Sequence, residues 1–319
     1  MQTKTIAMKR QSDNRKKLTL PVLGKILKET VKGFMDDNVM GLSGSLAYAT
    51  LFSIVPFFSL LVAIGGIFDV DLAGELYAVL EPVLGADVIK SLNSMLDNAS
   101  KSDSTTFATI LSLGISIFGA TTIFAEIQGS LNTIWGVKAV PKKSWLKFIM
   151  NRVLSFSVII AFAFILLITF SISSVISSLS ERFMASYPDV AEWIVKITGA
   201  LLNIFVTALI FTMIFKVLPD AKIKFKDVRT GAIVTTLLLL VGQWGISFYI
   251  SVANVGTVYG AAAFMAILIT WIYYSAIIIY IGAEFTEAWA NEMGGKIIPD
   301  EYAVATRTIE VPNEPADYS

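Results

Sequence analysis

The chain has 319 residues, of which 55% are hydrophobic and 16% charged, and its 25 basic and 25 acidic side chains give a net charge of zero. A soluble domain carries about 25% charged residues, so this composition excludes an ordinary soluble protein. The chain holds no cysteine and no histidine, which excludes disulfides, Ser-His-Asp triads, cysteine nucleophiles and the zinc sites built on those residues. We therefore expect a membrane protein that is not an enzyme and that carries no metal or cofactor.

Residues 1–40 form a polar, basic leader without the short apolar stretch of a cleaved signal peptide. Within it, residues 18–35 place apolar side chains at helical spacing opposite Lys25, Lys28, Glu29 and Lys32. The apolar face of this stretch comprises Leu23, Leu27, Val31 and Phe34. The pattern predicts an amphipathic helix on the cytoplasmic surface of the membrane.

Six apolar stretches follow, each close to the 20 residues that cross a bilayer core. They cover residues 42–67, 107–130, 153–177, 195–217, 230–252 and 259–283. The sequence thus predicts an all-α, polytopic membrane domain over residues 41–285, with six transmembrane helices and additional amphipathic interfacial helices. Residues 286–319 would form a polar, loosely ordered cytoplasmic tail.

The first predicted span contains Pro56, which removes the backbone bond to the carbonyl of Phe52. Small residues precede it, so a neighbouring helix can approach closely. We expect a kink at Pro56, which serves either packing or a hinge beside a binding site.

The connection after the first span, residues 68–104, is long and acidic. Apolar side chains recur in it at helical spacing on both sides of Pro82 and Gly85. This pattern predicts two short amphipathic helices on the outer face.

Lysine and arginine are distributed unevenly between alternate connections. The leader, the second and fourth connections and the tail carry 21 of them, whereas the other connections carry four. Basic residues collect on the cytoplasmic side, so both termini are expected in the cytoplasm of a bacterial cell. We attribute these clusters to membrane topology and to contacts with anionic lipids, and we expect no nucleic-acid partner. The two Gly-Lys pairs, Gly24-Lys25 and Gly295-Lys296, also lie outside any phosphate-binding loop pattern.

Four spans carry polar side chains along one face. The residues that we expect to line a substrate path or cavity are Glu126, Ser130, Asn203, Gln243, Ser247, Asn254, Tyr273, Tyr280 and Glu284. Such side chains either make interhelical hydrogen bonds, each contributing about 0.6 kcal/mol, or surround a hydrated path between the helices. The sequence leaves both interpretations open.

Glu126 stands out because it is a carboxylic acid within an apolar stretch. If the span begins at Phe107, Glu126 lies 19 residues in, about 28 Å along the helix and at the inner boundary. If Trp135 and Lys138 mark that boundary, Glu126 lies about 13 Å inside the membrane. We expect it in the inner third of the membrane, facing the bundle, with Gln243 or Tyr280 as a partner.

Three stretches resemble the YihY/BrkB-like integral membrane proteins. They are SLAYATLFSIVPFF after a leader ending FMDDNV, LNTIWGV at 131–137, and VYGAAAFMAILITWIYYSAIIIYIGAEF at 258–285. The resemblance covers about residues 30–290, and one departure is Ala49, where the family often has a second tyrosine. It implies a six-helix protein of the bacterial inner membrane, and it adds no known mechanism.

From the resemblance and the polar spans we expect a transporter or exporter of a lipid or small solute, with its cavity between helices. Membrane lipids are expected partners. The alternative is a non-transporting membrane scaffold that recruits partners in the cell envelope.

Overall fold

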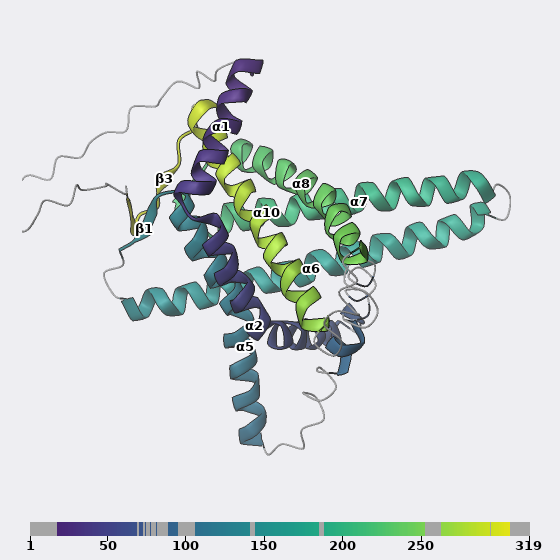
Figure 1. Ribbon diagram of the computed structural model, residues 1–319. Helices are drawn as coiled ribbons and strands as arrows, with labels where there is room; N and C mark the ends of the chain where they lie inside the picture. The colour runs from purple at the N-terminus through teal and green to yellow at the C-terminus, as the bar shows by residue number, and fades with distance from the viewer. Residues whose placement is uncertain are drawn as a thin grey trace, which may run out of the picture.

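The computed structural model describes residues 18–68, 70–72, 74, 77, 81, 89–94, 106–140, 144–184, 188–252, 263–293 and 295–306 (Figure 1). Its long elements are helices, as the composition predicts. They are α1 (Leu20–Asp36), α2 (Val39–Ile67), α5 (Thr106–Ile134), α6 (Ser144–Met184), α7 (Pro188–Val217), α8 (Phe225–Val252) and α10 (Ala263–Met293). The protein is therefore an all-α, polytopic membrane protein.

Five helical stretches in the described part of the chain are long and apolar enough to cross a membrane. They are Val39–Ile67, Ile149–Thr169, Lys196–Val217, Phe225–Ile246 and Met265–Met293. Each overlaps one of the six predicted spans. The remaining predicted span, 107–130, falls within α5, a continuous helix of 29 residues that is not among these five.

The helices pack around α10, which crosses the centre of the molecule in contact with α1, α2 and α8 (Figure 1). Helix α2 packs along α5, and α7 connects α6 to α8. The apolar core is continuous through these contacts and includes Leu61, Leu131, Phe215 and Tyr280. This arrangement brings the first and the last of the long helices, α1 and α10, side by side.

Small residues allow α8 and α10 to lie close together. A Cβ on Gly231 would lie 1.8 Å from Thr286 Oγ1, and a Cβ on Gly282 would lie 1.9 Å from Thr235 Oγ1. Each threonine hydroxyl donates to the carbonyl of the glycine four residues before it on its own helix. The two Gly-x-x-x-Thr faces therefore interlock without leaving a buried hydroxyl unpaired.

Pro56 lies inside α2, which continues through it as a helix. Its ring packs against α5, where a Cβ on Gly119 would lie 2.9 Å from Pro56 Cγ. The observed role of this proline is thus close packing between α2 and α5.

The expected amphipathic helix in the leader is confirmed as α1, and Phe34 of its predicted apolar face packs against the core. Ile26 and Thr30 are buried, and Ile26 packs with Phe285 and Ala288 of α10. Leu27 and Val31 are exposed. Helix α1 therefore carries apolar side chains on two faces. The face with Ile26 packs against α10, and the face with Leu27 and Val31 is exposed.

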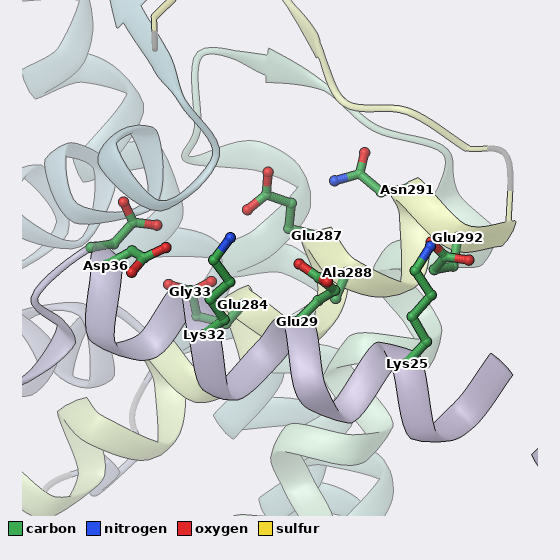
Figure 2. Close-up of a pocket in the computed structure, with 11 residues that line it drawn as sticks. Lys25, Glu29, Lys32, Gly33, Asp36, Glu284, Glu287, Ala288, Asn291 and Glu292 are labelled. Atoms are coloured by element: carbon green, nitrogen blue, oxygen red, sulfur yellow. The ribbon is translucent and has the colours of Figure 1, made fainter. Parts of the chain in front are cut away.

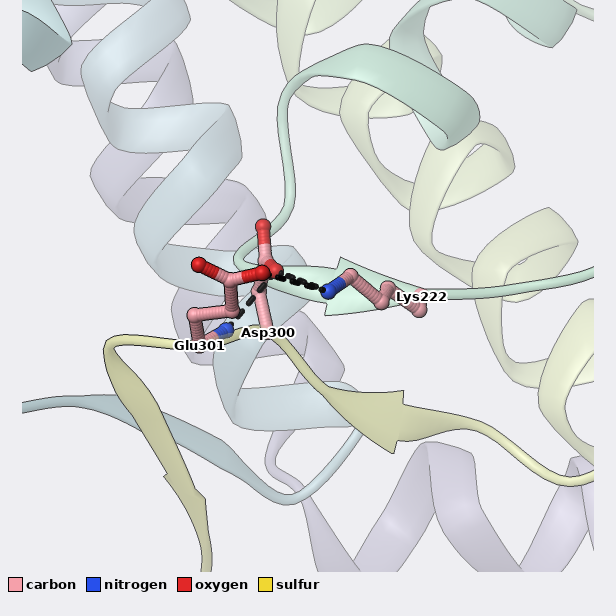
Figure 3. A network of polar contacts seen from close by, with 3 residues as sticks. All are labelled: Lys222, Asp300 and Glu301. Atoms are coloured by element: carbon pink, nitrogen blue, oxygen red, sulfur yellow. Dashed lines mark hydrogen bonds and ion pairs between the residues drawn. The ribbon is translucent and has the colours of Figure 1, made fainter. Parts of the chain in front are cut away.

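Part of the tail is ordered rather than loose, which corrects the prediction for residues 295–306. Strand β4 (Ala303–Ala305) pairs antiparallel with β1 (Val137–Ala139), and β3 (Ile298–Pro299) pairs antiparallel with β2 (Ala221–Lys222). Lys222 adds ion pairs to Asp300 at 2.8 Å and Glu301 at 3.7 Å (Figure 3). The tail thereby ties together the connections after α5 and α7.

Side chains of α5 hold the same region from the membrane side. Asn132 Nδ2 donates to Asp220 Oδ2 at 2.9 Å, and the Asp220 backbone N–H donates to Asn132 Oδ1 at 2.9 Å. Gln128 Nε2 donates to the same carboxyl oxygen at 3.3 Å. These bonds fix the loop before β2 on the end of α5.

Of the predicted outer helices, residues 72, 74, 77, 81 and 89–94 are described, and they are helical. Leu92 is buried against Phe58 of α2, with Tyr77 stacked on the same ring. The rest of this prediction lies outside the described residues.

Candidate functional site

Helix α1, Asp37 after it and the last turns of α10 line an open cavity of about 860 Å³, which we call the carboxylate cavity. It is lined by Lys25, Glu29, Lys32, Gly33, Asp36, Asp37, Glu284, Glu287, Ala288, Asn291 and Glu292 (Figure 2). The α10 residues of the lining are three or four positions apart along the helix: 284, 287 or 288, and 291 or 292. They therefore share one face of α10. The cavity therefore lies between two segments that are about 250 residues apart in the sequence.

The backbone between α1 and α2 places two acids in the lining of this cavity. Helix α1 ends at Asp36, and Asn38 adopts a left-handed conformation with φ of 50°. The Asn38 side chain accepts a hydrogen bond from the Gly41 backbone N–H at 3.3 Å and so caps α2. Asp36 and Asp37 are held in this short turn, next to α10.

The lining is strongly acidic. Six carboxylic acids face two lysines across it, and Lys25 is ion-paired with Glu292 at its outer end (Figure 2). A concave site whose lining carries excess negative charge attracts cations and protons.

Glu284 is the most deeply placed of these acids. Its side chain is 2% exposed, and its Oε1 has no hydrogen-bonding partner among the described residues. The other carboxyl oxygen lies against α1, where a Cβ on Gly33 would be 2.0 Å from Glu284 Oε2. A buried carboxyl group without a full set of partners is costly, so Glu284 leaves capacity for a ligand or a proton.

Asp37 lines the same cavity and lies beside Glu284. Burial raises the pKa of Asp37, an effect that the polar Glu284 side chain opposes and the nearby charge of Asp36 reinforces. Asp37 therefore holds a proton more readily than an exposed aspartate does.

A second hollow of about 580 Å³ lies on the other side of Asp37 and Glu287, which line both spaces. Its remaining walls come from the end of α5 and from β1, including Asn132 and Lys138. Trp135, between these two residues, is buried and donates from its indole N–H to the Ala283 carbonyl at 3.2 Å. It therefore fixes α5 to α10 beside Glu284, rather than standing in the lipid interface as the sequence suggested.

The structure brings together three of the predicted polar residues at a second place. The Tyr280 phenol has the Ser130 hydroxyl and the Glu126 carboxyl as its polar neighbours, although neither the phenol nor the Ser130 hydroxyl has a hydrogen-bonding partner among the described residues. Glu126 is half-buried and also lines a groove between α2 and α5. It lies eight residues before the end of α5, about 12 Å along the helix.

The other predicted site residues are scattered. Asn203 is exposed on α7 and accepts a hydrogen bond from Thr207 at 3.3 Å. Gln243 and Tyr273 are half-buried, on α8 and α10, and line none of the spaces described above. The Ser247 side chain and Asn254 lie outside the described residues.

Sequence reasoning missed most of the carboxylate cavity. It singled out Glu284 but left Asp36, Asp37 and Glu287 out, because they stand at the ends of apolar stretches where charged residues are ordinary. Topology offered a clue, since FMDDNV precedes the first span and GAEF ends the last one. Both stretches would lie on the same side of the membrane. In the part of the chain that the structure describes, no three acids converge closely enough to hold a metal ion.

Comparison with known proteins decides the family. The family model described as virulence factor BrkB matches residues 30–303. The chain belongs to the BrkB family. A membrane protein of Cronobacter sakazakii named UPF0761 membrane protein is 26% identical to this BrkB-family chain over 260 residues, which cover 79% of this chain and 83% of that protein.

Two further UPF0761 membrane proteins are similar to the chain. The one from Psychromonas ingrahamii is 28% identical over 78% of this chain and 82% of its own length. The one from Chromobacterium violaceum is 28% identical over 79% of this chain, and the match spans 58% of that longer protein. No solved structure matches the chain. The resemblance noted in the sequence is thus confirmed as family membership.

Proposed function

We propose that this BrkB-family membrane protein is a transporter or exporter of a small solute or lipid, and that the carboxylate cavity is its cytoplasmic binding site. The observation that carries the proposal is the buried Glu284 carboxyl, which lacks a partner for Oε1 at the wall of an 860 Å³ cavity. A cavity of this volume accommodates a small organic molecule. An incompletely satisfied acid within it supplies the polar anchor that such a site needs.

The charge of the lining indicates the kind of solute. Six acids and two lysines favour a cation, or a zwitterion that presents an amine to Glu284. Asp37, whose pKa burial raises, adds a group that can take up and release a proton. Intramembrane acids of this kind carry protons in pumps and transporters, so cation export in exchange for protons fits the lining.

The orientation is part of the proposal. The basic leader, the connections after α5 and α7, and the tail would face the cytoplasm, with both termini inside the inner membrane. The carboxylate cavity, which lies between α1 of the leader and the end of α10, would then be at the cytoplasmic side of the membrane.

Reconstitution of the full chain into liposomes tests the proposal. A panel of organic amines, organic anions and dye-labelled phospholipids would be offered to protein-containing and empty vesicles, with and without a pH gradient. We expect protein-dependent movement of at least one amine or phospholipid, and no movement of the anions. Transport of anions alone, or no transport together with one stably copurifying envelope protein, would replace the proposal with the scaffold alternative.

A further inference from the structure

The groove beside Glu126 is a separate feature, on the membrane-facing side of α2 and α5. Its volume is about 400 Å³, and its walls include Tyr48, Ala49 and Phe52 of α2 and Phe118 and Thr122 of α5. The three aromatic side chains are 70%, 67% and 55% exposed, respectively. All of these α2 residues belong to a stretch long and apolar enough to span the membrane, and we infer from this that the groove faces lipid.

A basic side chain contacts two residues of this groove, Phe118 and Thr122. Arg152 of α6 donates from Nη1 to Thr122 Oγ1 at 3.2 Å, to Thr121 Oγ1 at 3.0 Å and to the Phe118 carbonyl at 3.3 Å. Its guanidinium also stacks over the Phe118 ring, 4.1 Å from the ring centroid. An arginine held in this way keeps a positive charge at the edge of an apolar groove, where it matches a phosphate.

The groups follow one another along α5 in a definite order. Glu126 lies nearest the end of the helix that carries the basic connection, about 12 Å from Ile134. Thr122, which contacts Arg152, lies one turn or about 5.4 Å deeper on the same face. Phe118 lies a further turn deeper, next to the aromatic side chains of α2.

A phospholipid in the leaflet on the side of the basic connection presents its own groups in a matching order. Its amine would be outermost at Glu126, the phosphate next at Arg152, and the acyl chains deepest along Phe118 and Phe52. The two carbons that join an ethanolamine nitrogen to its phosphate span a separation of about one helical turn. The helix of 29 residues is also longer than the bilayer core, so Glu126 can stand at headgroup level while α5 protrudes.

We propose that the groove between α2 and α5 binds one amine-bearing phospholipid of the cytoplasmic leaflet, with Glu126 holding the amine and Arg152 the phosphate. The occupant is a lipid of the membrane and not a free solute, because the groove walls are apolar and exposed within a span. This site is distinct from the carboxylate cavity, and the inference does not depend on transport.

Native mass spectrometry of the purified full chain tests the site, with phosphatidylethanolamine and phosphatidylglycerol added in equal amounts. We expect one phosphatidylethanolamine to remain bound with a preference of about tenfold, the effect of one charge-assisted hydrogen bond. Glu126→Gln should remove this preference while phosphate-dependent binding remains, and Arg152→Gln should weaken binding of both lipids. Glu81→Gln and Arg229→Gln, on exposed residues away from the groove, serve as controls and should bind as the unmodified chain does.

A third variant keeps the test decisive if the charge changes disturb folding. Ala49→Tyr fills the groove without altering a charge, and it should abolish lipid retention while the melting temperature in lipid-free detergent stays unchanged. Equal retention of the two lipids by the unmodified chain would overturn the proposal. So would undiminished phosphatidylethanolamine binding in Ala49→Tyr or in a folded Glu126→Gln protein.

Discussion

Glu284 of α10 lies against Gly33 of α1 so closely that a Cβ on Gly33 would be 2.0 Å from the carboxyl Oε2. The absence of a side chain at Gly33 is therefore what lets the acid occupy the cavity wall. The contact also joins the first described helix of the chain to the last long one. The position of Glu284 depends on how α1 docks on α10.

We predict that Gly33→Ala slows transport and leaves the stability of the protein nearly unchanged. The clashing atoms are the end of a flexible side chain, so the carboxyl group can move while the backbone stays in place. Alanine is the better helix former by about 0.8–1 kcal/mol, which offsets the cost of the displacement. We expect the melting temperature to change little and the transport rate in liposomes to fall about tenfold, with loss of roughly 1.4 kcal/mol of binding or transition-state free energy.

Gly24→Ala is the matched control for this change, because Gly24 is on the same helix and a Cβ there meets nothing within 4 Å. It should leave transport unchanged and raise stability slightly. If Gly33→Ala transported as fast as Gly24→Ala, the packed position of Glu284 would have no part in function.

Asp37→Asn should make the protein more stable at neutral pH. Burial raises the pKa of Asp37 above its ordinary value of 3.8, so the folded protein holds this proton more tightly than the unfolded chain does. The contribution of this protonated group to the unfolding free energy is fully present below pH 3.8, and it is lost as the pH rises through the raised pKa. Asparagine keeps the size of the side chain and removes that loss.

Thermal unfolding in detergent from pH 3.5 to 8 measures this effect. The difference in melting temperature between Asp37→Asn and the unmodified chain should grow with pH, reaching a few degrees, and vanish in the acid range. Acids that share the site and could contribute are Asp36, Glu284 and Glu287. Asp36→Asn, at the exposed neighbouring position, should show a smaller effect, and a pH-independent difference for Asp37→Asn would contradict the assignment.

Asn132→Ala should loosen the region where the tail is anchored. It removes two hydrogen bonds of 2.9 Å with Asp220, one of them to the carboxyl group. The expected loss is about 2–4 kcal/mol of unfolding free energy, since bonds to charged groups contribute more than neutral ones. Hydrogen–deuterium exchange should show faster exchange at β2 and β3 than in Thr133→Ala, and equal protection in the two variants would show that the tail is held by other contacts.

The proposed orientation can be checked by labelling, because the natural chain has no cysteine. Asn291→Cys and Ser94→Cys each introduce one exposed thiol at opposite ends of the bundle. An impermeant maleimide should label Ser94→Cys in intact cells and Asn291→Cys only in inside-out vesicles. The reverse pattern would place the termini and the carboxylate cavity outside the cytoplasm.

The helices could be predicted because long apolar stretches carry strong periodic patterns, and α1, α2, α8 and α10 lie where those patterns place them. The strands could not be predicted from the sequence. Strands β2 and β3 have two residues each, too few for alternation of apolar and polar side chains to be visible. Their pairing also depends on contacts made by Asp220 and Asn132 across 88 residues.

The site shows the same division. Glu284 was found because an acid next to an apolar stretch is conspicuous, and Tyr280, one of two partners considered for Glu126, lies near Glu126 and Ser130. Asp37 was missed because its role arises only when α1 packs on α10. The sequence alone could not choose between the two apolar faces of α1, represented by Leu27 and Ile26, so that packing was not predictable.

The most direct test of the central claim is the transport rate of Glu284→Gln beside the unmodified chain and Glu81→Gln in the same liposomes. Glutamine keeps the size of the side chain and removes its charge and its titration. For the amine or phospholipid that the unmodified chain moves, we predict a rate at least about tenfold lower for Glu284→Gln and an unchanged rate for Glu81→Gln. A folded Glu284→Gln protein that transports at the unmodified rate would contradict the assignment of the carboxylate cavity as the binding site.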